Sequence, residues 1–511
     1  MREKYESLAL ADLKAIAKAR GIKGTSVMKK AEVVEAMLSL DMQEQEQKAK
    51  AQSSMPIRKV EQEAMAEPCI KRAVYSEAVE KAEPRMERTV RSEAVEKAEP
   101  HIERTARSEG AEKPEVRTER PARAERTENE RTLAELDSGE MANGILEVMP
   151  DGYGFIRCEN YLPGENDVYV APSQIRRFGL KTGDIIEGNT RVKTQAEKFS
   201  ALLFVKKING YPPEVAHRRR NFEDMTPIFP NERLRMETAG ASVAMRIMDL
   251  MSPVGKGQRG MIVSPPKAGK TTLLKEVAKS IKRNNPEMHL IILLIDERPE
   301  EVTDIREAIE GPNVEVIYST FDELPEHHKR VSEMVIERAK RLVEHGRDVT
   351  ILLDSITRLT RAYNLVVPPS GRTLSGGLDP AALHMPKRFF GAARNMRESG
   401  SLTILATALV ETGSKMDDVV YEEFKGTGNM EMVLDRKLSE RRVFPAIDIP
   451  KSGTRREDLL LSPEEMEAIN IIRKALNSLK PEEAVDKILD MFSRTRNNVE
   501  FVNMVKKIKF F

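Results

Sequence analysis

One segment, residues 260–283, limits the possible folds more than any other part of the sequence. It reads GMIVSPPKAGKTTLLKEVAKSIKR, so that a short apolar run leads into a loop and then into a helical pattern with Leu273, Val277 and Ile281 on one face. A strand, a loop and a helix in this order form a phosphate-binding loop, in which backbone N–H groups hold phosphate oxygens. Ser264 stands at the position of the usual first glycine.

Two further apolar runs end in acidic residues. VTILLDS ends at Asp354, and LIILLIDERPEEV contains Asp296 and Glu297 at its end. Because ligands bind at the carboxyl edge of open α/β sheets, we expect these acids to converge on the loop. Lys270 would then reach the β and γ phosphates, Thr271 and Asp354 would hold Mg²⁺, and Glu297 would deprotonate the attacking water. Each acid alone would fit a helix cap or a salt bridge, so the prediction depends on their convergence.

A cation near the γ phosphate also favours phosphoryl transfer, and it is often an arginine from a neighbouring subunit. The candidates are Arg442 in ERRVFPAID and Arg455 in SGTRRED. The sequence alone does not separate them from surface arginines. Phe444 is placed to stack on adenine, although it would serve equally as a core residue.

The rest of the chain divides into segments of different character. Residues 1–42 carry two helical patterns and predict a small N-terminal helical unit. Residues 43–137 are rich in charged residues, Gln and Ala, and residues 141–212 read as short strands separated by turns. Residues 213–249 form a connector. From about 250 onward, strand-like runs alternate with helices up to about 461, which predicts a mostly parallel sheet, and the tail to residue 511 predicts two amphipathic helices.

The charged segment contains a 16-residue repeat. SEAVEKAEP begins at Ser76 and again at Ser92, and SEGAEKPE begins at Ser108. Mixed-charge repeats of this kind bury too little apolar area to offset the entropy lost on ordering. The sequence therefore predicts a disordered linker between the helical unit and the strands that follow.

The five predicted strands of residues 141–212 are typical of a small barrel of the OB type. Within GYGFIR, Tyr153 and Phe155 are two residues apart and so share a face, and Tyr169 and Phe199 follow in later strands. Rings on such a face stack on unpaired bases, which contributes about 1–3 kcal/mol per base, although a ring in a strand is more commonly core. The neighbouring glycines, which would clear space for a base, favour exposure, and the string resembles the RNA-binding strand of cold-shock domains.

The composition mainly excludes certain classes of protein and kinds of site. The 83 basic and 82 acidic residues give a net charge of +1, which removes a basic balance as an argument for nucleic-acid binding. Cys69 and Cys158 are too few for a thiolate zinc cluster or a disulfide framework and predict free thiols in a reducing compartment. The apolar runs are far shorter than a membrane span, and no signal peptide is visible. We expect a soluble, cytoplasmic protein with no membrane association.

Taken together, the motifs resemble one family. They are GYGFIR, YVAPSQIRRF, GKGQRG, PPKAGKTT, LLIDERPEEVTD, LLDSITRLTRAYN, PKRFFGAARN, EEFKGTGNMEM and RRVFPAID followed by SGTRRE, and they are similar to those of the bacterial transcription termination factor Rho family. The resemblance covers residues 1–42 and about 141–511. It implies an N-terminal helical unit, a cold-shock-like OB barrel and a RecA-like P-loop ATPase domain with C-terminal helices.

The resemblance also implies an activity and partners. The protein would be a ring-shaped homohexamer that binds cytosine-rich single-stranded RNA, hydrolyses ATP with Mg²⁺, moves 5′ to 3′ along the RNA and releases it from RNA polymerase. An elongation factor of the NusG type would be a further partner. Two alternatives stay open: a RecA-like rotary or assembly ATPase that acts on protein, and a passive RNA-binding regulator whose ATP site is only structural.

Within the ATP site, the resemblance assigns roles by position. Glu297 would be the catalytic glutamate, Asp354 the Walker B acid, Arg455 the arginine donated by a neighbouring subunit and Arg442 a second arginine at that interface. The residues lining the site would be Gly255, Lys256, Gly257, Gln258, Arg259, Gly260, Lys267, Ala268, Gly269, Lys270, Thr271, Thr272 and Arg298.

The resemblance places RNA at two sites. Tyr153 stands where a phenylalanine is common and Phe199 where a tyrosine is common, so both keep a ring, but a hydroxyl contact at 199 is lost. Arg372 stands where a lysine is common, which alters the geometry of a phosphate contact. The primary site would be Gly152, Tyr153, Gly154, Phe155, Ile156, Arg157, Asp167, Val168, Tyr169, Glu197, Lys198 and Phe199. The secondary site, in the pore of the ring, would be Thr373, Leu374, Ser375, Gly376 and Gly377 of the loop at residues 370–377, with Lys415.

Overall fold

The structure is a computed structural model, and the chain separates into two compact units, Met1–Lys113 and Pro114–Phe511. The described residues are 17, 29–31, 33–34, 136–157, 160–194, 197–478 and 481–507. No helix among these residues is long and apolar enough to span a bilayer.

In the first unit, the described residues Ala17, Val33 and Val34 are helical and buried. Val33 and Val34 belong to the second helical pattern expected from the sequence. The predicted disordered linker lies outside the described residues except for its last two positions, Leu136 and Asp137. Asp137 already begins a strand, four residues before the predicted start of the barrel.

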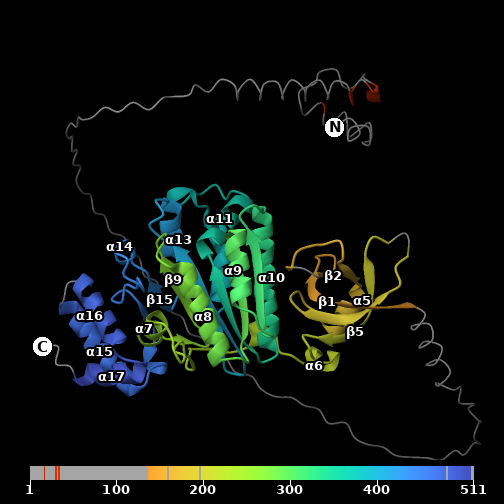
Figure 1. Ribbon diagram of the computed structural model, residues 1–511. Helices are drawn as coiled ribbons and strands as arrows, with labels where there is room; N and C mark the ends of the chain where they lie inside the picture. Colours follow the sequence, from red (N-terminus) through yellow and green to blue (C-terminus); the bar gives the residue numbers. More distant parts are fainter. Residues whose placement is uncertain are drawn as a thin grey trace, which may run out of the picture. The chain divides into compact units, whose positions relative to one another are not determined.

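A closed five-stranded barrel opens the second unit, which confirms the predicted OB-type fold (Figure 1). The side chains alternate along the strands, so that Ile156 and Val168 point into the barrel core with Leu146 and Ile186. A short helix, α5 (Pro172–Phe178), follows the third strand. In barrel order the strands are β1 (Asp137–Val148), β2 (Gly154–Arg157), β3 (Val168–Val170), β5 (Ser200–Ile208) and β4 (Ile185–Arg191).

The larger part of the second unit is built on a nine-stranded sheet with the order β11-β10-β12-β14-β9-β15-β16, to which β13 and β6 are attached. From β11 to β15 the neighbouring strands are parallel. These strands read as continuous Ile, Leu and Val runs because both faces of the sheet are covered. Their bounds are β6 (Pro227–Ile228), β9 (Arg259–Ser264), β10 (His289–Glu297), β11 (Val314–Thr320), β12 (Asp348–Asp354), β13 (Arg394–Met396), β14 (Ser401–Leu409), β15 (Met430–Val433) and β16 (Gly453–Thr454).

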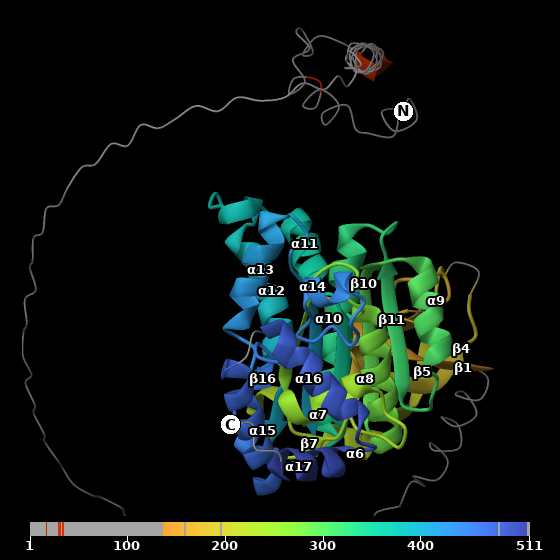
Figure 2. The ribbon, with the colours of Figure 1, turned by 60° about the vertical axis from the view of Figure 1, so that its left-hand side comes forward.

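Helices cover the two faces of this sheet, as Figure 2 shows from the side. Along β10, Ile292 packs with the helices of one face and Ile291 with those of the other. The first face carries α7 (Val243–Met251), α8 (Lys270–Asn284), α9 (Pro299–Ala308), α15 (Pro463–Ser478), α16 (Pro481–Ser493) and α17 (Asn498–Lys507). The second face carries α10 (Pro325–Glu344), α11 (Ile356–Val366), α12 (Pro380–Gly391) and α13 (Lys415–Lys425).

The tail differs from the prediction of two helices, because α17 is a separate helix after α16. The loop between them is held by the buried Arg246 of α7, whose guanidinium donates to the carbonyl oxygens of Phe492, Thr495 and Asn497 at 2.7–2.8 Å. Arg246 also lies over the ring of Phe492. These contacts attach the tail to α7.

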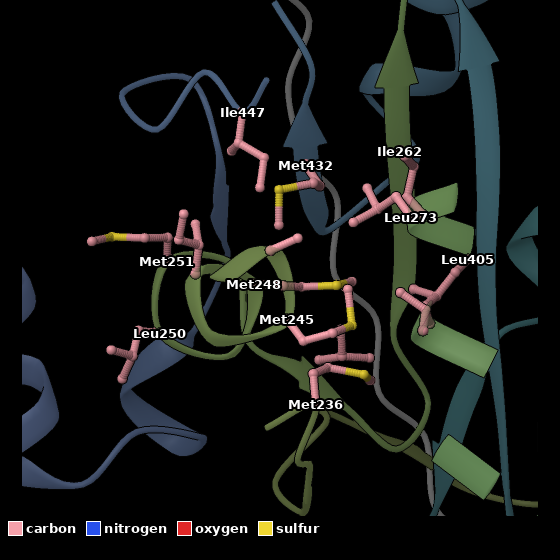
Figure 3. Packing of buried hydrophobic residues seen from close by; sticks show 14 of the residues in the cluster. Met236, Met245, Met248, Leu250, Met251, Ile262, Leu273, Leu405, Met432 and Ile447 are labelled. Carbon is pink, nitrogen blue, oxygen red and sulfur yellow. The ribbon is translucent and has the colours of Figure 1, made fainter. Parts of the chain in front are cut away.

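Methionines fill the space between α7 and the sheet. Figure 3 shows Met245 and Met248 of α7 beside Met236 and Met432, and Ile262 of β9 belongs to the same cluster. All five side chains are fully buried. Unbranched, flexible thioether side chains suit this irregular gap.

Shorter elements connect these layers. Among them, the barrel is attached through Arg219, whose guanidinium makes a bidentate contact with the buried Asp184 at 2.6 and 2.7 Å and an ion pair with Glu344 of α10 at 3.0 Å. Tyr161 from the barrel donates its hydroxyl to Glu315 of β11. The connecting elements are α6 (Pro213–His217), η1 (Phe222–Asp224), β7 (Arg233–Leu234), β8 (Val254–Gly255), η2 (Ser375–Gly377), α14 (Arg436–Glu440) and η3 (Glu457–Leu459).

Candidate nucleotide-binding and RNA-binding sites

The phosphate-binding loop lies where the sequence predicts it, between β9 and α8. Gly269 precedes the helix with a φ of +92°, which a residue with a side chain rarely adopts, and a Cβ at this position would meet nothing within 4 Å. Lys267 also has a positive φ of 64°. The loop therefore presents its backbone to open space at the N-terminus of a 15-residue helix, which suits an anion.

The predicted convergence of strand ends is confirmed by the parallel order of β10, β12, β14 and β9. The Nζ atom of Lys270 lies 2.8 Å from Glu297 Oε1 and 2.5 Å from Asp354 Oδ1. Both carboxylates are almost fully buried. Thr407 at the end of β14 donates its hydroxyl to Asp354 Oδ1 at 2.7 Å, and Arg358 of α11 lies 3.6 Å from Glu297 Oε2.

The mutual contacts of Lys270, Glu297 and Asp354 shift the pKa values of Lys270 and Glu297. Burial acts to lower the pKa of Lys270, but the charges of Asp354 and Glu297 outweigh it and hold that pKa above the ordinary lysine value. Burial and the charge of Asp354 raise the pKa of Glu297, against the opposing effect of Lys270. A glutamate with a raised pKa is a better proton acceptor than an exposed one, as a general base requires.

The residues that would hold a metal ion fit Mg²⁺. Asp354 supplies a carboxylate and Thr271 a hydroxyl, which at present donates to Glu301 Oε2 at 3.3 Å. Among the described residues, no group of three or more His, Cys, Asp or Glu side chains is arranged to hold a metal alone. A carboxylate and a hydroxyl beside the phosphate-binding loop suit Mg²⁺, which is usually held by one or two carboxylates together with substrate phosphates.

Two hollows flank the loop and share Lys267 and Phe444. Phe444 is 53% exposed, so it is available for stacking and is not a core residue. Arg442 lines the hollow that also contains Pro266 and Glu411, and it therefore lies beside the loop of its own chain. Arg298 is exposed at the start of α9 and lies 4.0 Å from Glu301.

Arg455 and the stretch Gly255–Gly260 lie elsewhere. Gly255–Gly260 precede β9 or begin it, whereas the loop follows β9, so they lie at the opposite edge of the sheet. Asn429 joins them to Arg455, because its side chain contacts Gln258 while its carbonyl accepts the Arg455 N–H at 2.8 Å. The expectation that Gly255–Gly260 line the same pocket as the loop is therefore wrong within one chain.

On the barrel, four rings form one cluster. Phe155 lies at its centre, with ring centroids 5.8 Å from Tyr153, 6.0 Å from Tyr169 and 5.2 Å from Phe199. All four rings are partly exposed, because the core positions between them are taken by Ile156 and Val168. The side chains of Ile156 and Val168 therefore point away from the predicted RNA face.

Buried charged residues lie against the four-ring cluster. Arg157 lies 4.8 Å from the Phe155 centroid and forms ion pairs with Asp167 and with Glu147, the latter at 2.7 Å. Arg157 and Asp167 are both buried. Gly154 does not clear space for a base as expected: a Cβ there would lie 2.9 Å from the Glu147 carbonyl and from Leu146, so its glycine is required by packing inside the barrel.

The remaining predicted barrel residues lie beside the rings. Gly152 has a φ of +86° in the turn before β2. Lys198 is exposed and its Nζ lies 5.1 Å from the Phe199 ring centroid. Glu197 pairs with Arg191 and accepts the Thr194 N–H at 3.1 Å. Among the predicted RNA-binding residues, Lys198 is therefore the exposed cation beside the aromatic cluster.

The two predicted pore segments come together. Gly376 of η2 lies so close to α13 that a Cβ would be 2.5 Å from the Met416 amide nitrogen and 2.7 Å from the Lys415 carbonyl carbon. Thr373, Ser375, Gly377 and Lys415 are exposed around this contact, and Leu374 is partly buried. Arg361 of α11 pairs with the buried Asp417 in the first turn of α13 at 2.6 Å.

Three family models match the chain. Residues 142–214 match the Rho termination factor RNA-binding domain, and residues 4–46 match the Rho termination factor N-terminal domain. Residues 244–454 match the nucleotide-binding domain of the ATP synthase alpha/beta family.

Whole proteins match as well. The chain is 57% identical over 377 residues to transcription termination factor Rho of Pseudomonas aeruginosa, covering 72% of this chain and 89% of that protein. It is 56% identical over 375 residues to the Rho factors of Aquifex aeolicus and Bacillus subtilis, covering 72% and 73% of this chain and 86% and 87% of theirs. The chain belongs to the transcription termination factor Rho family. Membership of the Rho family confirms the resemblance inferred from the motifs.

Some residues of this Rho-family site were missed from the sequence. Arg358 lies four residues beyond Asp354, and Thr407 lies near the carboxyl end of β14, the strand between β12 and β9. The spacing Asp354–Arg358 in DSITR was visible, and it places an arginine beside the strand ends. Thr407 carried no signal, because its contact with Asp354 depends on the order of strands in the sheet.

Proposed function

We propose that this chain is an ATP-dependent RNA translocase that terminates transcription. It binds single-stranded RNA on the aromatic face of the barrel, hydrolyses ATP at the carboxyl edge of the sheet, and moves 5′ to 3′ along RNA as a homohexameric ring. The observation that carries the proposal is the presence, in one chain, of the Lys270–Glu297–Asp354 cluster and of the four-ring cluster around Phe155. An ATPase that acts on protein has no use for the second cluster.

At the sheet edge, each residue has a distinct task. Lys270 exchanges its carboxylate partners for the β and γ phosphates, which releases Glu297 to accept a proton from the attacking water. Thr271 and Asp354 would hold Mg²⁺, which would supply charge neutralisation for phosphoryl transfer. Arg358 stays within reach of Glu297 and keeps its carboxylate oriented.

The positions of the arginines support a ring. Arg455 lies at the opposite edge of the sheet from its own loop, with Asn429 and Glu431 around it. It reaches a γ phosphate only if a second subunit brings that phosphate to it, as in a closed ring of identical subunits. Arg442 lies beside Lys267 of its own chain and contributes positive charge there.

RNA is held in two places. On the barrel, partly exposed rings bind the unpaired bases of cytosine-rich strands by stacking. In the ring, residues 373–377 and Lys415 face the RNA backbone, and Arg361 with Asp417 links this region to α11, which follows Asp354 directly. RNA polymerase and an elongation factor of the NusG type are the partners of the assembled ring.

The experiment is the steady-state rate of ATP hydrolysis by the full chain with and without poly-cytidine. We expect a large stimulation by poly-cytidine and none by a duplex RNA of equal length. An unchanged rate contradicts the RNA translocase and favours the protein-directed ATPase. RNA binding with no ATP hydrolysis at all favours the passive regulator.

A further inference from the structure

The carboxylate of Glu147 joins the aromatic face of the barrel to α10. Glu147 of β1 lies directly opposite Phe155 of β2 in the antiparallel register, so its side chain shares the face on which the rings lie. Arg330, in the second turn of α10, donates from Nη2 to Glu147 Oε1 at 2.7 Å and to Oε2 at 2.5 Å. A helix that packs on the nine-stranded sheet therefore places a guanidinium beside the predicted RNA face.

Glu147 is shared between two arginines. Its Oε2 atom also accepts from Arg157 Nε at 2.8 Å and lies 2.7 Å from Arg157 Nη2. Arg157 in turn pairs with Asp167 and lies over the ring of Phe155. Because Arg157 and Asp167 are buried and Glu147 is mostly buried, solvent and salt screen these charges much less than they would on an open surface.

The formal charges at this point of the barrel cancel only when α10 is included. The group of four charged side chains, here called the charge cluster, consists of Arg157, Asp167, Glu147 and Arg330. Without Arg330, one arginine would face two carboxylates. The surplus negative charge would then lie beside the surface that RNA phosphates approach, and it would oppose their binding.

We propose that Arg330 is a positioning residue for RNA binding, which completes the RNA face of the barrel by balancing the charge of Glu147. The proposal rests on the proposed RNA site around Phe155. Arg330 acts through Glu147, whose carboxylate it holds, and leaves Arg157 with enough positive charge to attract RNA. The RNA affinity of the barrel is therefore set in part by a residue of the ATPase part of the chain.

The test measures binding of a fluorescently labelled oligocytidine to the full chain by anisotropy, without ATP. Arg330→Gln leaves the charge cluster with a surplus negative charge and should weaken binding by about 5-fold at low salt. Glu147→Gln removes a negative charge and should bind at least as tightly as the wild type. The double variant is neutral again, so its affinity should return to within about 2-fold of the wild type.

Salt and two neighbouring changes give the controls. In about 1 M salt, where the Debye length is about 3 Å, the difference between Arg330→Gln and the wild type should shrink. Arg330→Lys keeps the charge and should bind as the wild type does. Lys329→Gln removes a charge from the preceding residue of α10 and should also keep the wild-type affinity.

A purely structural tie between α10 and the barrel gives a different result. Both single changes would then weaken binding, and the double variant would bind no better than Arg330→Gln. That result overturns the proposal, as does wild-type affinity in Arg330→Gln or an equal loss in Lys329→Gln. If the wild type binds no oligocytidine, or if Phe155→Ala binds it as tightly as the wild type, the RNA site on the barrel is itself wrong.

Discussion

The sheet edge and the barrel face place their charged residues in opposite ways. At the sheet edge, the buried carboxylates of Glu297 and Asp354 both form ion pairs with the partly buried Lys270. On the barrel, the rings around Phe155 are partly exposed, and the charges lie behind them in the buried pair Arg157–Asp167. The nucleotide site must therefore exchange internal partners when ATP binds, whereas the RNA face needs little rearrangement.

This difference has a functional consequence. The ion pairs of Lys270 occupy the two acids that hydrolysis requires, so that the catalytic groups become available only when phosphates replace them. Aromatic rings that already contact one another lose little conformational freedom on stacking with bases. The barrel is suited to hold RNA continuously, and the sheet edge is suited to change state with each ATP.

The largest effect is expected from Glu297→Gln at the sheet edge. Removing the proton acceptor should lower kcat by about 10²–10⁴-fold, while ATP binding and RNA binding stay close to wild type. The measurement is single-turnover hydrolysis together with RNA affinity. Glu300→Gln, an exposed acid on the neighbouring α9, is the matched control. Normal hydrolysis by Glu297→Gln contradicts the assigned role.

Removing the negative charge of Asp167 should destabilise the barrel and leave the nine-stranded sheet unchanged. Asp167 accepts from Arg157 and from the Gly164 N–H at 3.0 Å. Asp167→Asn therefore removes one negative charge from beside the buried guanidinium of Arg157. We expect the local free energy of unfolding to fall by about 3 kcal/mol, read as faster hydrogen exchange in β2 and β3. Glu165→Gln, an exposed neighbour, should change nothing. Equal protection in Asp167→Asn refutes the supporting role of this pair.

A ring deletion tests the RNA face directly. Phe155→Ala should weaken binding of poly-cytidine by about 1–3 kcal/mol, the contribution of one stacked base. ATP affinity should not change. Phe204→Ala removes a ring that is 37% exposed on β5 outside the cluster and serves as the control. If both variants lose the same affinity, the cluster has no special part in RNA binding.

The smallest effect concerns pH at the junction of barrel and sheet. Burial, together with the positive charge of Arg219, lowers the pKa of His345 to about 4, although Asp184 opposes the shift. An unfolded chain protonates this histidine near its ordinary pKa of 6.5, so its contribution to stability is full above pH 6.5 and is lost as pH falls towards 4.

Thermal unfolding at pH 7.5 and pH 5 should show a drop in Tm that is smaller in His345→Gln than in the wild type. His327→Gln, an exposed histidine beside Glu323, should behave as the wild type does. An identical drop in all three proteins would exclude His345 as its source.

Much of the sheet edge could be predicted from the sequence because local patterns carry it. The strand, loop and helix around Lys270 are contiguous, and Glu297 and Asp354 each end an apolar run. The strand-end rule for parallel sheets then brings them together without further information. The contact of Thr407 with Asp354 could not be found in this way, since it depends on which strands are neighbours.

The fold type of the barrel could be predicted from the sequence, but the roles of its individual residues could not all be. Alternation placed Tyr153 and Phe155 on one face correctly, but the function of Gly154 was misread, because its close neighbours Leu146 and Glu147 come from another strand. The incorrect prediction that Gly255–Gly260 line the same pocket as the phosphate-binding loop has a similar origin. A motif carried over from a family says which residues matter, whereas only the sheet shows at which edge they lie.

The most direct test of the account is release of a transcript from a stalled elongation complex by the full chain. With ATP, we expect the wild type to release the RNA, Phe155→Ala to release it only at higher protein concentration, and Glu297→Gln to bind the transcript without releasing it. Release by Glu297→Gln, or release by the wild type with a non-hydrolysable ATP analogue, would contradict the account, because RNA capture and ATP hydrolysis would then not act together.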